Sequence, residues 1–329
     1  MSSYINKIIK LTNTKTETKH IILCGDKNYI KYCGITMTSV LHSNSAEKFT
    51  FELFCDDISD ADLEKLKKTQ RKYNTNINIY IINKDEVNSL IDSVNKETHI
   101  SVATFFRILA FESLDRCIEK ALYLDSDLLV RGNINSLYEY KFKANELIIA
   151  IEDIDGKNCG DNINVEKYFN AGVMFVNLAK WIKESYTDKC IRDIIKKHYT
   201  MMDQDALNVL LVDKVKYIEE KYNFQYSMDY KNRKNEYNDL IISKKNPAIV
   251  HFIGKIKPWD ELGRYFPISN EYLKIKDESE WKDISLTNIS SIKTQILRRG
   301  YAKSMMRAAL HNKRYIEYLK GLFYYIKNR

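Results

Sequence analysis

ALYLDSDLLV, the stretch from Ala121 to Val130, is an apolar strand interrupted by two carboxylates, Asp125 and Asp127. Burying an unpaired carboxylate is strongly unfavourable, so two of them beside a hydrophobic strand require a compensating cation or donor. Side chains at positions i and i+2 of an extended backbone point the same way, which lets both carboxylates reach one ion. Oxygen ligands of this kind suit Mg²⁺ or Mn²⁺, and such ions commonly bridge to substrate phosphates. Because isolated Asp-x-Asp pairs are also ordinary in turns, the surrounding sequence has to decide between the two interpretations.

Strands and helices alternate on the N-terminal side of this stretch. Apolar strands are expected at residues 20–23, 49–55 and 77–82, with helices at 29–42 and 59–73 between them. The second helix opens with a Ser-x-x-Asp pattern that resembles a capping box. This β-α-β-α-β order predicts an α/β protein with a mainly parallel sheet and helices on its faces.

The C-terminal side continues with a helix at 101–114, strands at 147–151, 171–177 and 248–253, and a helix at 206–212. Ligands bind outside the carboxyl ends of the strands in an open parallel sheet. Five residues with carboxylate or imidazole side chains follow such ends: Asp26, Asp125, Asp127, Asp153 and His251. The sequence therefore predicts that they share one site.

Composition narrows the class of protein. The 329 residues are 44% apolar and 12% aromatic, which is typical of a globular chain. The six cysteines are scattered without a Cys-x-x-Cys pair, so we expect reduced thiols in a cytoplasmic protein and neither zinc nor disulfides. Neither a signal peptide nor a membrane-spanning stretch of ~20 apolar residues is evident, which predicts a soluble or peripheral protein.

The positive charge is concentrated in the tail. Residues 293–329 hold ten basic residues and one acidic residue, a net of +9, whereas the chain as a whole carries +8. From about residue 290 the pattern predicts amphipathic helices with Phe and Tyr among the Lys and Arg residues. Such a helix suits an anionic membrane surface, where each basic residue contributes roughly 1 kcal/mol.

Six separated motifs run through the chain, and they are Cys24-Gly25-Asp26-x-Asn28-Tyr29, His99-Ile100-Ser101-x-x-Thr104-x-x-Arg107, Tyr123-Leu124-Asp125-Ser126-Asp127, Tyr168-Phe169-Asn170-Ala171-Gly172-Val173, Asp203-Gln204-Asp205-x-Leu207-Asn208 and His251-Phe252-Ile253-Gly254-Lys255-Ile256-Lys257-Pro258-Trp259. With them the chain resembles the retaining nucleotide-sugar glycosyltransferases of family 8, which include glycogenin and the bacterial lipopolysaccharide galactosyl- and glucosyltransferases. The resemblance covers nearly the whole chain, with the motifs in the family's order.

This resemblance implies a GT-A type nucleotide-diphosphosugar transferase fold, with a mixed, mainly parallel sheet, helices on both faces and a basic helical C-terminal extension. It suggests an N-terminal extension at residues 1–19 and a catalytic domain at 20–265. A basic, amphipathic region for membrane association or acceptor binding would follow at 266–329.

The resemblance also implies a metal centre and a donor site. Asp125, Asp127 and His251 would chelate Mg²⁺ or Mn²⁺, and the ion would bridge the two phosphates of a UDP-sugar. Asp26, Asn28 and Tyr29 would hold uracil and ribose, and Lys257 would contact the diphosphate. The full set implied to bind the nucleotide sugar is Cys24, Gly25, Asp26, Lys27, Asn28, Tyr29, Arg107, Asp125, Ser126, Asn170, His251, Gly254, Lys255, Ile256 and Lys257.

Catalytic roles are implied for Gln204, Asp203 and Asp153. Asp153 and Asp203, with Arg107 and Asn170, would hold the sugar hydroxyls, while Gln204 would lie near the anomeric carbon. His99 would lie on the acceptor or diphosphate side. Retention of configuration ordinarily suggests a carboxylate nucleophile. The residue expected at the anomeric carbon is Gln204, whose amide is a poor nucleophile. We therefore expect front-face substitution, in which the acceptor hydroxyl attacks from the side that UDP leaves.

Simple structural roles compete with these assignments. Asp203 is also suited to cap the helix that follows it. Arg107 could pair with Glu112 or Asp115, as exposed helical charges often do. His251 could be a hydrogen-bonded core histidine at the end of an apolar strand.

Three further positions do not determine how the nucleotide base is contacted. Asp26 is also a suitable N-cap for the helix after it, a role compatible with nucleotide binding. Cys24 and Lys27 stand where some relatives have small or acidic residues, so base contacts are expected to differ in detail.

The acceptor is suggested by the C-terminal part. Residues 259–283 and the basic tail resemble the enterobacterial lipopolysaccharide core hexosyltransferases more than glycogenin. We therefore expect an α-hexose to be moved from UDP-glucose or UDP-galactose to the lipid A-core oligosaccharide, with the cationic tail docked on the cytoplasmic face of the inner membrane. Nothing in the sequence separates the two sugars.

Three alternatives remain. They are a transferase acting on capsule or lipooligosaccharide, a non-catalytic glycan- or membrane-binding module on the same fold, and a nucleic-acid arm in the tail. The Met, Phe and Tyr content of the tail favours lipid, so no nucleic-acid partner is expected.

Overall fold

A computed structural model describes residues 3–12, 18–94, 102–197, 199–228, 245–261, 268–287 and 315–327, together with residues 263, 266, 299–300, 302–303, 306–307, 309–310 and 313. His99 and its neighbours therefore lie outside the described residues. Within this part of the chain, no helix is both long and apolar enough to cross a bilayer.

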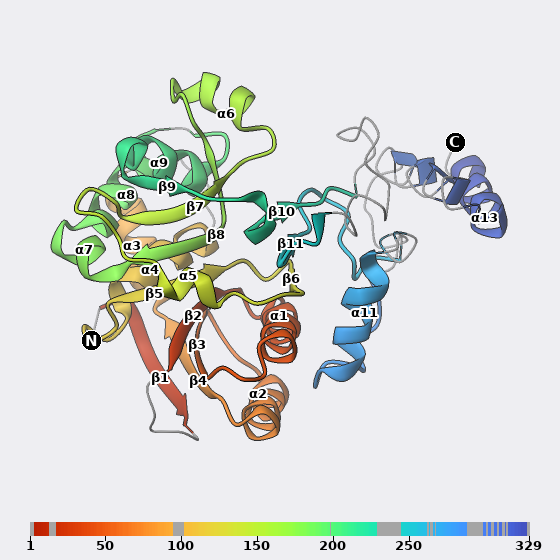
Figure 1. Cartoon of the computed structure of the whole chain (residues 1–329), viewed down its shortest axis with the longest axis horizontal. Coiled ribbons are helices and arrows are strands. Elements are labelled where there is room, and N and C mark those ends of the chain that lie inside the picture. The colour runs from red at the N-terminus through yellow and green to blue at the C-terminus, as the bar shows by residue number, and fades with distance from the viewer. Residues whose placement is uncertain are drawn as a thin grey trace.

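An eight-stranded mixed sheet forms the centre of the molecule, with strand order β1-β4-β3-β2-β5-β8-β7-β9 (Figure 1). β4, β3, β2 and β5 run parallel, as the alternation of elements predicts, whereas β1 and β8 run antiparallel to their neighbours and β9 runs parallel to β7. The strands are β1 (Ile5–Leu11), β2 (Lys19–Cys24), β3 (Phe49–Cys55), β4 (Asn76–Ile82), β5 (Lys120–Leu124), β7 (Ile148–Glu152), β8 (Phe169–Asn177) and β9 (Val215–Tyr217).

Helices cover both faces of this sheet, so the expected α/β class, a mixed sheet with helices on both faces, is confirmed (Figure 1). One face carries α1 (Ile30–Ser43) and α2 (Asp60–Tyr73), and the other carries α3 (Lys84–Val94), α4 (Phe106–Ser113), α7 (Leu178–Lys183), α8 (Tyr186–Lys196) and α9 (Met202–Leu210). The other helices that precede the C-terminal part are α5 (Asn135–Glu139), α6 (Gly156–Ile163), η1 (Val102–Phe105), η2 (Val212–Lys214) and η3 (Glu220–Tyr222).

The central strands are buried on both sides, which explains their continuous apolar sequences. In β2, Ile21 and Leu23 belong to the core under α1 and α2, while Ile22 belongs to the core under α4. The start of α2 also follows the sequence, because the Ser59 hydroxyl accepts a hydrogen bond from the Asp62 backbone N–H at 3.1 Å.

The strand quoted at the outset is divided in the structure. β5 ends at Leu124, and the chain resumes as β6 (Leu128–Val130) in a separate three-stranded sheet with β10 (Phe224–Gln225) and β11 (Ile249–His251). β11 runs antiparallel to β6 and places His251 opposite Leu128. The Phe252 N–H then donates to the Asp127 carbonyl oxygen at 3.0 Å. This pairing brings His251 to the two aspartates, 124 residues away from Asp127 in sequence.

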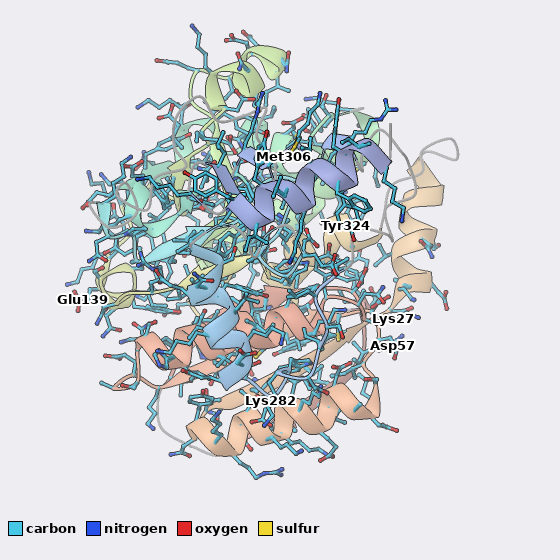
Figure 2. The ribbon with its side chains drawn as sticks, turned by 90° about the vertical axis from the view of Figure 1, so that its right-hand side faces the viewer. Lys27, Asp57, Glu139, Lys282, Met306 and Tyr324 are labelled. Atoms are coloured by element: carbon cyan, nitrogen blue, oxygen red, sulfur yellow. The ribbon has the colours of Figure 1, made fainter. Side chains whose placement is uncertain are left out.

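The C-terminal part begins inside the core. α11 (Ile268–Glu278) packs on α1, and Trp281 is buried against Gly34. α13 (Tyr315–Lys327) lies at the far end of the molecule from the sheet (Figure 1). Figure 2 shows Met306 and Tyr324 on the C-terminal segments, on the face of the molecule that also carries α11.

Candidate functional site

Asp125, Asp127 and His251 form a cluster whose ligand atoms all lie within 4.8 Å of one another. His251 Nε2 is 3.3 Å from Asp127 Oδ1 and 4.0 Å from Asp125 Oδ2. Asp127 Oδ1 is buried and has no hydrogen-bond partner in the described part of the chain. Leaving a buried carboxylate oxygen unsatisfied is costly, and a cation beside it would remove that cost. The residues present therefore fit a divalent metal bound by two oxygens and one nitrogen.

Arg107 and Tyr123 hold Asp125 through its Oδ1 atom, the oxygen that does not face His251. Arg107 Nη2 lies 3.1 Å from Asp125 Oδ1, and the Tyr123 hydroxyl donates to the same atom at 2.6 Å. Arg107 Nε also pairs with Asp203 Oδ2 at 2.9 Å, and its Nη1 donates to the Ala171 carbonyl oxygen at 2.9 Å. Burial lowers the pKa of the Arg107 guanidinium, but the two aspartates raise this pKa by more, so the group stays charged.

The competing partners for Arg107 are wrong. Glu112 pairs with Arg116 at 2.7 Å, and Asp115 accepts from the Cys117 N–H at 3.1 Å. Arg107 instead points toward the carboxyl end of β5.

Lys257 is the counter-charge of Asp127. Its Nζ lies 2.6 Å from Asp127 Oδ2 and donates to the Phe252 carbonyl oxygen. Burial raises the pKa of the Asp127 carboxyl and the Lys257 ammonium lowers it, and the net shift takes this pKa well below its ordinary range. Asp127 is consequently charged at neutral pH.

Gly172 leaves room for His251 and Asp125 to lie close to β8. It lies in β8, where its carbonyl oxygen accepts from the Asp125 N–H at 2.9 Å. A Cβ on this residue would stand 2.3 Å from His251 Cε1 and 2.9 Å from Asp125 Oδ2. Only glycine permits this approach of the strand to two of the candidate ligands.

Gln204 lies in the first turn of α9, next to β8, and lines a cavity together with the cluster. This helix begins at Met202, four residues before the expected start, so Asp203 is inside the helix and is not its N-cap. The side-chain Oε1 of Gln204 accepts from the Ala171 N–H at 2.9 Å. Its Nε2 donates to the Tyr168 hydroxyl at 3.2 Å and to Asp153 Oδ2 at 3.4 Å. Because a backbone N–H can only donate, this contact fixes the orientation of the amide.

Asp203 and Asp153 differ in environment. Burial raises the pKa of the Asp203 carboxyl, Arg107 lowers it, Asp125 raises it, and the net shift is upward. Asp153 lies at the end of β7 and accepts from Asn170 Nδ2 at 2.9 Å.

Two cavities meet at the aspartate pair. One, of about 270 Å³, is lined among others by Cys24, Gly25, Asp26, Tyr29, Arg107 and Ser126. The other, of about 500 Å³, is lined among others by Asp153, Asn170, Gln204, His251, Gly254 and Lys257. Both are lined by Asp125 and Asp127, so the candidate metal site lies between them.

The remaining predicted nucleotide contacts have local structural roles. Asp26 Oδ1 accepts from the Asn28 N–H at 2.7 Å, two residues before α1 begins, and the Lys27 N–H donates to Asp56 Oδ1 at 2.8 Å. Ile256 is buried in the core and, like Lys255, lines neither of these two cavities.

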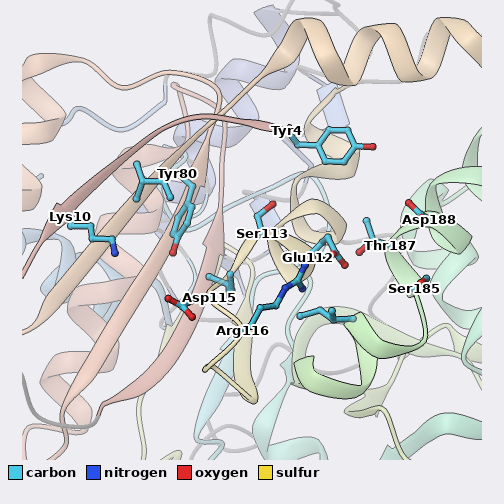
Figure 3. A pocket seen from close by; sticks show the side chains of 13 residues that line it. Tyr4, Lys10, Tyr80, Glu112, Ser113, Asp115, Arg116, Ser185, Thr187 and Asp188 are labelled. Atoms are coloured by element: carbon cyan, nitrogen blue, oxygen red, sulfur yellow. Dashed lines mark hydrogen bonds and ion pairs between the residues drawn. The ribbon is translucent and has the colours of Figure 1, made fainter. Parts of the chain in front are cut away.

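A larger cavity, of about 650 Å³, lies elsewhere, between β1, β4, α4 and the start of α8 (Figure 3). Its lining includes Tyr4, Tyr80 and the Arg116–Glu112 ion pair. The candidate metal cluster found among the described residues lines the other two cavities. Chemistry, and not volume, therefore identifies the candidate site.

Three residues at the site, Asp56, Asn223 and Gln225, lie outside the six motifs, while Tyr123 and Tyr168 belong to motifs in which no role is predicted for them. Gln225 Oε1 accepts from the Ile154 N–H and its Nε2 donates to the Glu152 carbonyl oxygen, both at 2.9 Å. These contacts join β10 to the end of β7. The sequence around Asp56, Asn223 and Gln225 carries no local sign of such a contact.

Comparison with known proteins agrees with this geometry. The family model described as "Glycosyl transferase family 8" matches residues 20–263. The lipopolysaccharide glucosyltransferase WaaO of Escherichia coli K12 is 29% identical over 99% of this chain and 96% of its own length. The lipopolysaccharide 1,3-galactosyltransferase of Salmonella typhimurium is 30% identical over 92% and 87%, respectively.

Solved structures share the fold. The galactosyltransferase LgtC, determined in complex with donor and acceptor sugar analogs, superposes with a TM-score of 0.64 at 24% identity, over 79% of this chain and 96% of LgtC. The bifunctional glycosyltransferase WbbM superposes with a TM-score of 0.68 at 18% identity, over 82% of this chain and 51% of WbbM.

Proposed function

The chain belongs to glycosyl transferase family 8, and on that premise we propose that it transfers glucose or galactose from a UDP-sugar to a lipopolysaccharide core oligosaccharide, with retention of the α configuration. The observation that carries the proposal is the Asp125-Asp127-His251 cluster between two cavities. A nucleoside on one side and a sugar on the other would place the diphosphate at the cluster. The two relatives named for lipopolysaccharide transfer match nearly the whole chain and support the acceptor.

The chemistry at the diphosphate follows from charge. A bound Mg²⁺ or Mn²⁺ would neutralise the negative charge that develops on the leaving UDP. Lys257 supplies a second positive charge beside Asp127. On the nucleoside side, Tyr29 is 44% exposed beside Asp26, which leaves its ring face available for a base.

The sugar side supports front-face substitution. Gln204 is held by the Ala171 N–H on its oxygen and faces Asp153 with its nitrogen, so its amide is positioned to stabilise charge and not to form a covalent bond. The acceptor oxygen then bonds to the anomeric carbon as the bond from that carbon to the diphosphate oxygen breaks. The acceptor proton passes to the leaving diphosphate, which gives the glycoside and UDP.

The acceptor is presented at a membrane surface in this proposal. On α13, Tyr315, Ile316, Leu319, Phe323 and Ile326 are each between 60% and 69% exposed. Spacings of three, four and seven residues place them on neighbouring positions of the helix, and Lys320 and Lys327 flank them. An exposed apolar stripe with basic flanks fits an anionic bilayer, so the enzyme would be peripheral on the cytoplasmic face of the inner membrane.

The function is tested with a panel of UDP-sugars and purified truncated core. We expect transfer of one hexose from UDP-glucose or UDP-galactose, dependent on Mn²⁺ or Mg²⁺, with an α linkage in the product. Asp125→Ala should abolish transfer and UDP-sugar hydrolysis, while Asp213→Asn, a change at an exposed carboxylate in η2, should leave both intact. Activity that persists without a divalent ion would overturn the metal assignment.

The acceptor is tested in the cell. Mass spectrometry of the core from a deletion strain should show the loss of one hexose, and an intact core would point to capsule or another surface glycan. Absence of both transfer and hydrolysis with every donor would favour a non-catalytic binding module.

A further inference from the structure

Asn223 lies behind the candidate metal ligand His251, on the side away from the aspartates. It follows η3 and immediately precedes β10, whose Gln225 pairs with His251 of β11. Its side chain is 1% exposed. The Asn223 Oδ1 atom is 3.0 Å from His251 Nδ1, and its Nδ2 donates to Asn170 Oδ1 at 2.9 Å. Asn223 therefore joins the metal cluster to the sugar side of the site.

The orientation of the Asn170 and Asn223 amides follows from neighbouring groups that can only donate or can only accept a hydrogen bond. Asn170 Oδ1 accepts from the Gly172 backbone N–H at 3.0 Å, and Asn170 Nδ2 donates to the Asp153 carboxylate at 2.9 Å. A backbone N–H can only donate and a carboxylate can only accept, so the Asn170 amide has one satisfactory orientation. Its oxygen then faces Asn223, and Asn223 must present its NH₂ group to that oxygen.

The orientation of Asn223 determines the tautomer of His251. With its NH₂ group turned to Asn170, Asn223 presents its oxygen to His251 Nδ1. Since that oxygen can only accept, Nδ1 must carry the proton. In the neutral imidazole the lone pair is then on Nε2, the atom that faces Asp125 and Asp127.

We propose that Asn223 is a positioning residue that sets His251 in the Nδ1–H tautomer, so that Nε2 is available to the metal. The proposal rests on the proposed function, because it takes the cluster to be a metal site. Partners that hold the second nitrogen of a metal-ligating histidine typically contribute about 10- to 100-fold in metal affinity or activity.

Two substitutions test the two hydrogen bonds of Asn223 separately. Asn223→Leu removes both hydrogen bonds, whereas Asn223→Asp keeps an acceptor for His251 Nδ1 and replaces the donor to Asn170 with a carboxylate oxygen. Asn44→Leu is the matched control. Asn44 is also a buried amide, but its hydrogen bonds go to the backbone groups of Val40, Gly132 and Ile134.

The measurements are Mn²⁺ binding by electron paramagnetic resonance in the presence of UDP, and the ¹⁵N shifts of His251 without metal. In the wild type we expect Nδ1 protonated, and Asn223→Leu should lose this preference together with about 10- to 100-fold in Mn²⁺ affinity. Asn223→Asp should keep both. Asn44→Leu should lower the melting temperature and leave Mn²⁺ affinity unchanged.

The outcomes distinguish an error in the metal site from an error in the role of Asn223. If the wild-type protein and His251→Ala bind Mn²⁺ equally, the metal site itself is wrong. If the wild type binds Mn²⁺ through His251 but Asn223→Leu binds it equally well, only the role of Asn223 is wrong. A wild-type His251 protonated on Nε2 in the metal-free protein would also overturn the inference.

Discussion

Gly172→Ala tests the geometry of the metal cluster without changing any of its ligands. The added Cβ would lie 2.3 Å from His251 Cε1, 2.8 Å from His251 Nδ1 and 2.9 Å from Asp125 Oδ2. Ordinary van der Waals contact begins near 3.4 Å, so the imidazole must move by roughly 1 Å, a displacement of the size that can cost about 10²-fold in the rate of a preorganised catalytic site. His251 has little room to move, because it is buried and its Nδ1 faces Asn223 Oδ1 at 3.0 Å.

We therefore expect the Mn²⁺ affinity of Gly172→Ala to fall by about 100-fold, equivalent to about 3 kcal/mol. Overpacking of this kind also lowers the free energy of unfolding, by about 1–3 kcal/mol, so the protein should still fold. The two effects are separable because affinity is measured on the fraction that is folded.

The assay is Mn²⁺ titration by electron paramagnetic resonance with UDP present, alongside thermal unfolding of the metal-free protein. Gly300→Ala is the control, since a Cβ at Gly300 would meet no atom of the described residues within 4 Å. Wild-type Mn²⁺ affinity in Gly172→Ala would refute the reasoning, because it would show that His251 can shift without loss and that the cluster is not preorganised.

Four further predictions concern single side chains. Tyr29→Ala should weaken UDP binding, measured by calorimetry, by the roughly 1–3 kcal/mol that base stacking contributes, while Tyr29→Phe should not. Gln204→Ala should lower kcat with little change in the KM for the donor, and nearly full turnover would exclude its proposed role. Lys257→Met removes a positive charge from Asp127, so Mn²⁺ binding without nucleotide should tighten while turnover falls; weaker Mn²⁺ binding would contradict this. Burial raises the pKa of Asp260 to about 6 from 3.8, partly opposed by the Lys257 N–H. The native state then holds the proton longer than the unfolded chain, so stability should decline by up to about 3 kcal/mol as pH rises from about 4 to 6, and Asp260→Asn should flatten this part of a urea-unfolding profile.

The sequence predicts the central strands well because burial on both faces leaves an unmistakable apolar run. β3 has the expected bounds, and β2 and β4 differ from expectation by one residue at their ends. β1 was not expected, because residues 5–11 are mostly exposed or half-buried and are held at the sheet edge by pairing with β4. An edge strand of this kind is determined by its partner more than by its own composition.

Site residues follow a similar division. Asp125 and Asp127 are visible because carboxylates beside an apolar strand contradict their surroundings. The contact partners of Arg107 depend on where β5, β8 and α9 end in space, and local sequence offered only Glu112 and Asp115. Asn223 sits in a segment, KYNFQY, that gives no sign of the histidine 28 residues away.

The two cations of the site leave room for a divalent metal although positive charge is already present. Arg107 holds Oδ1 of Asp125, and Lys257 holds Oδ2 of Asp127. Each therefore turns the other oxygen of its partner toward His251 Nε2. Neither cation satisfies those inward oxygens, one of which has no hydrogen-bond partner in the described chain. The cations thus select which oxygens face the centre, and a divalent ion held there by Asp125, Asp127 and His251 would supply positive charge for a diphosphate.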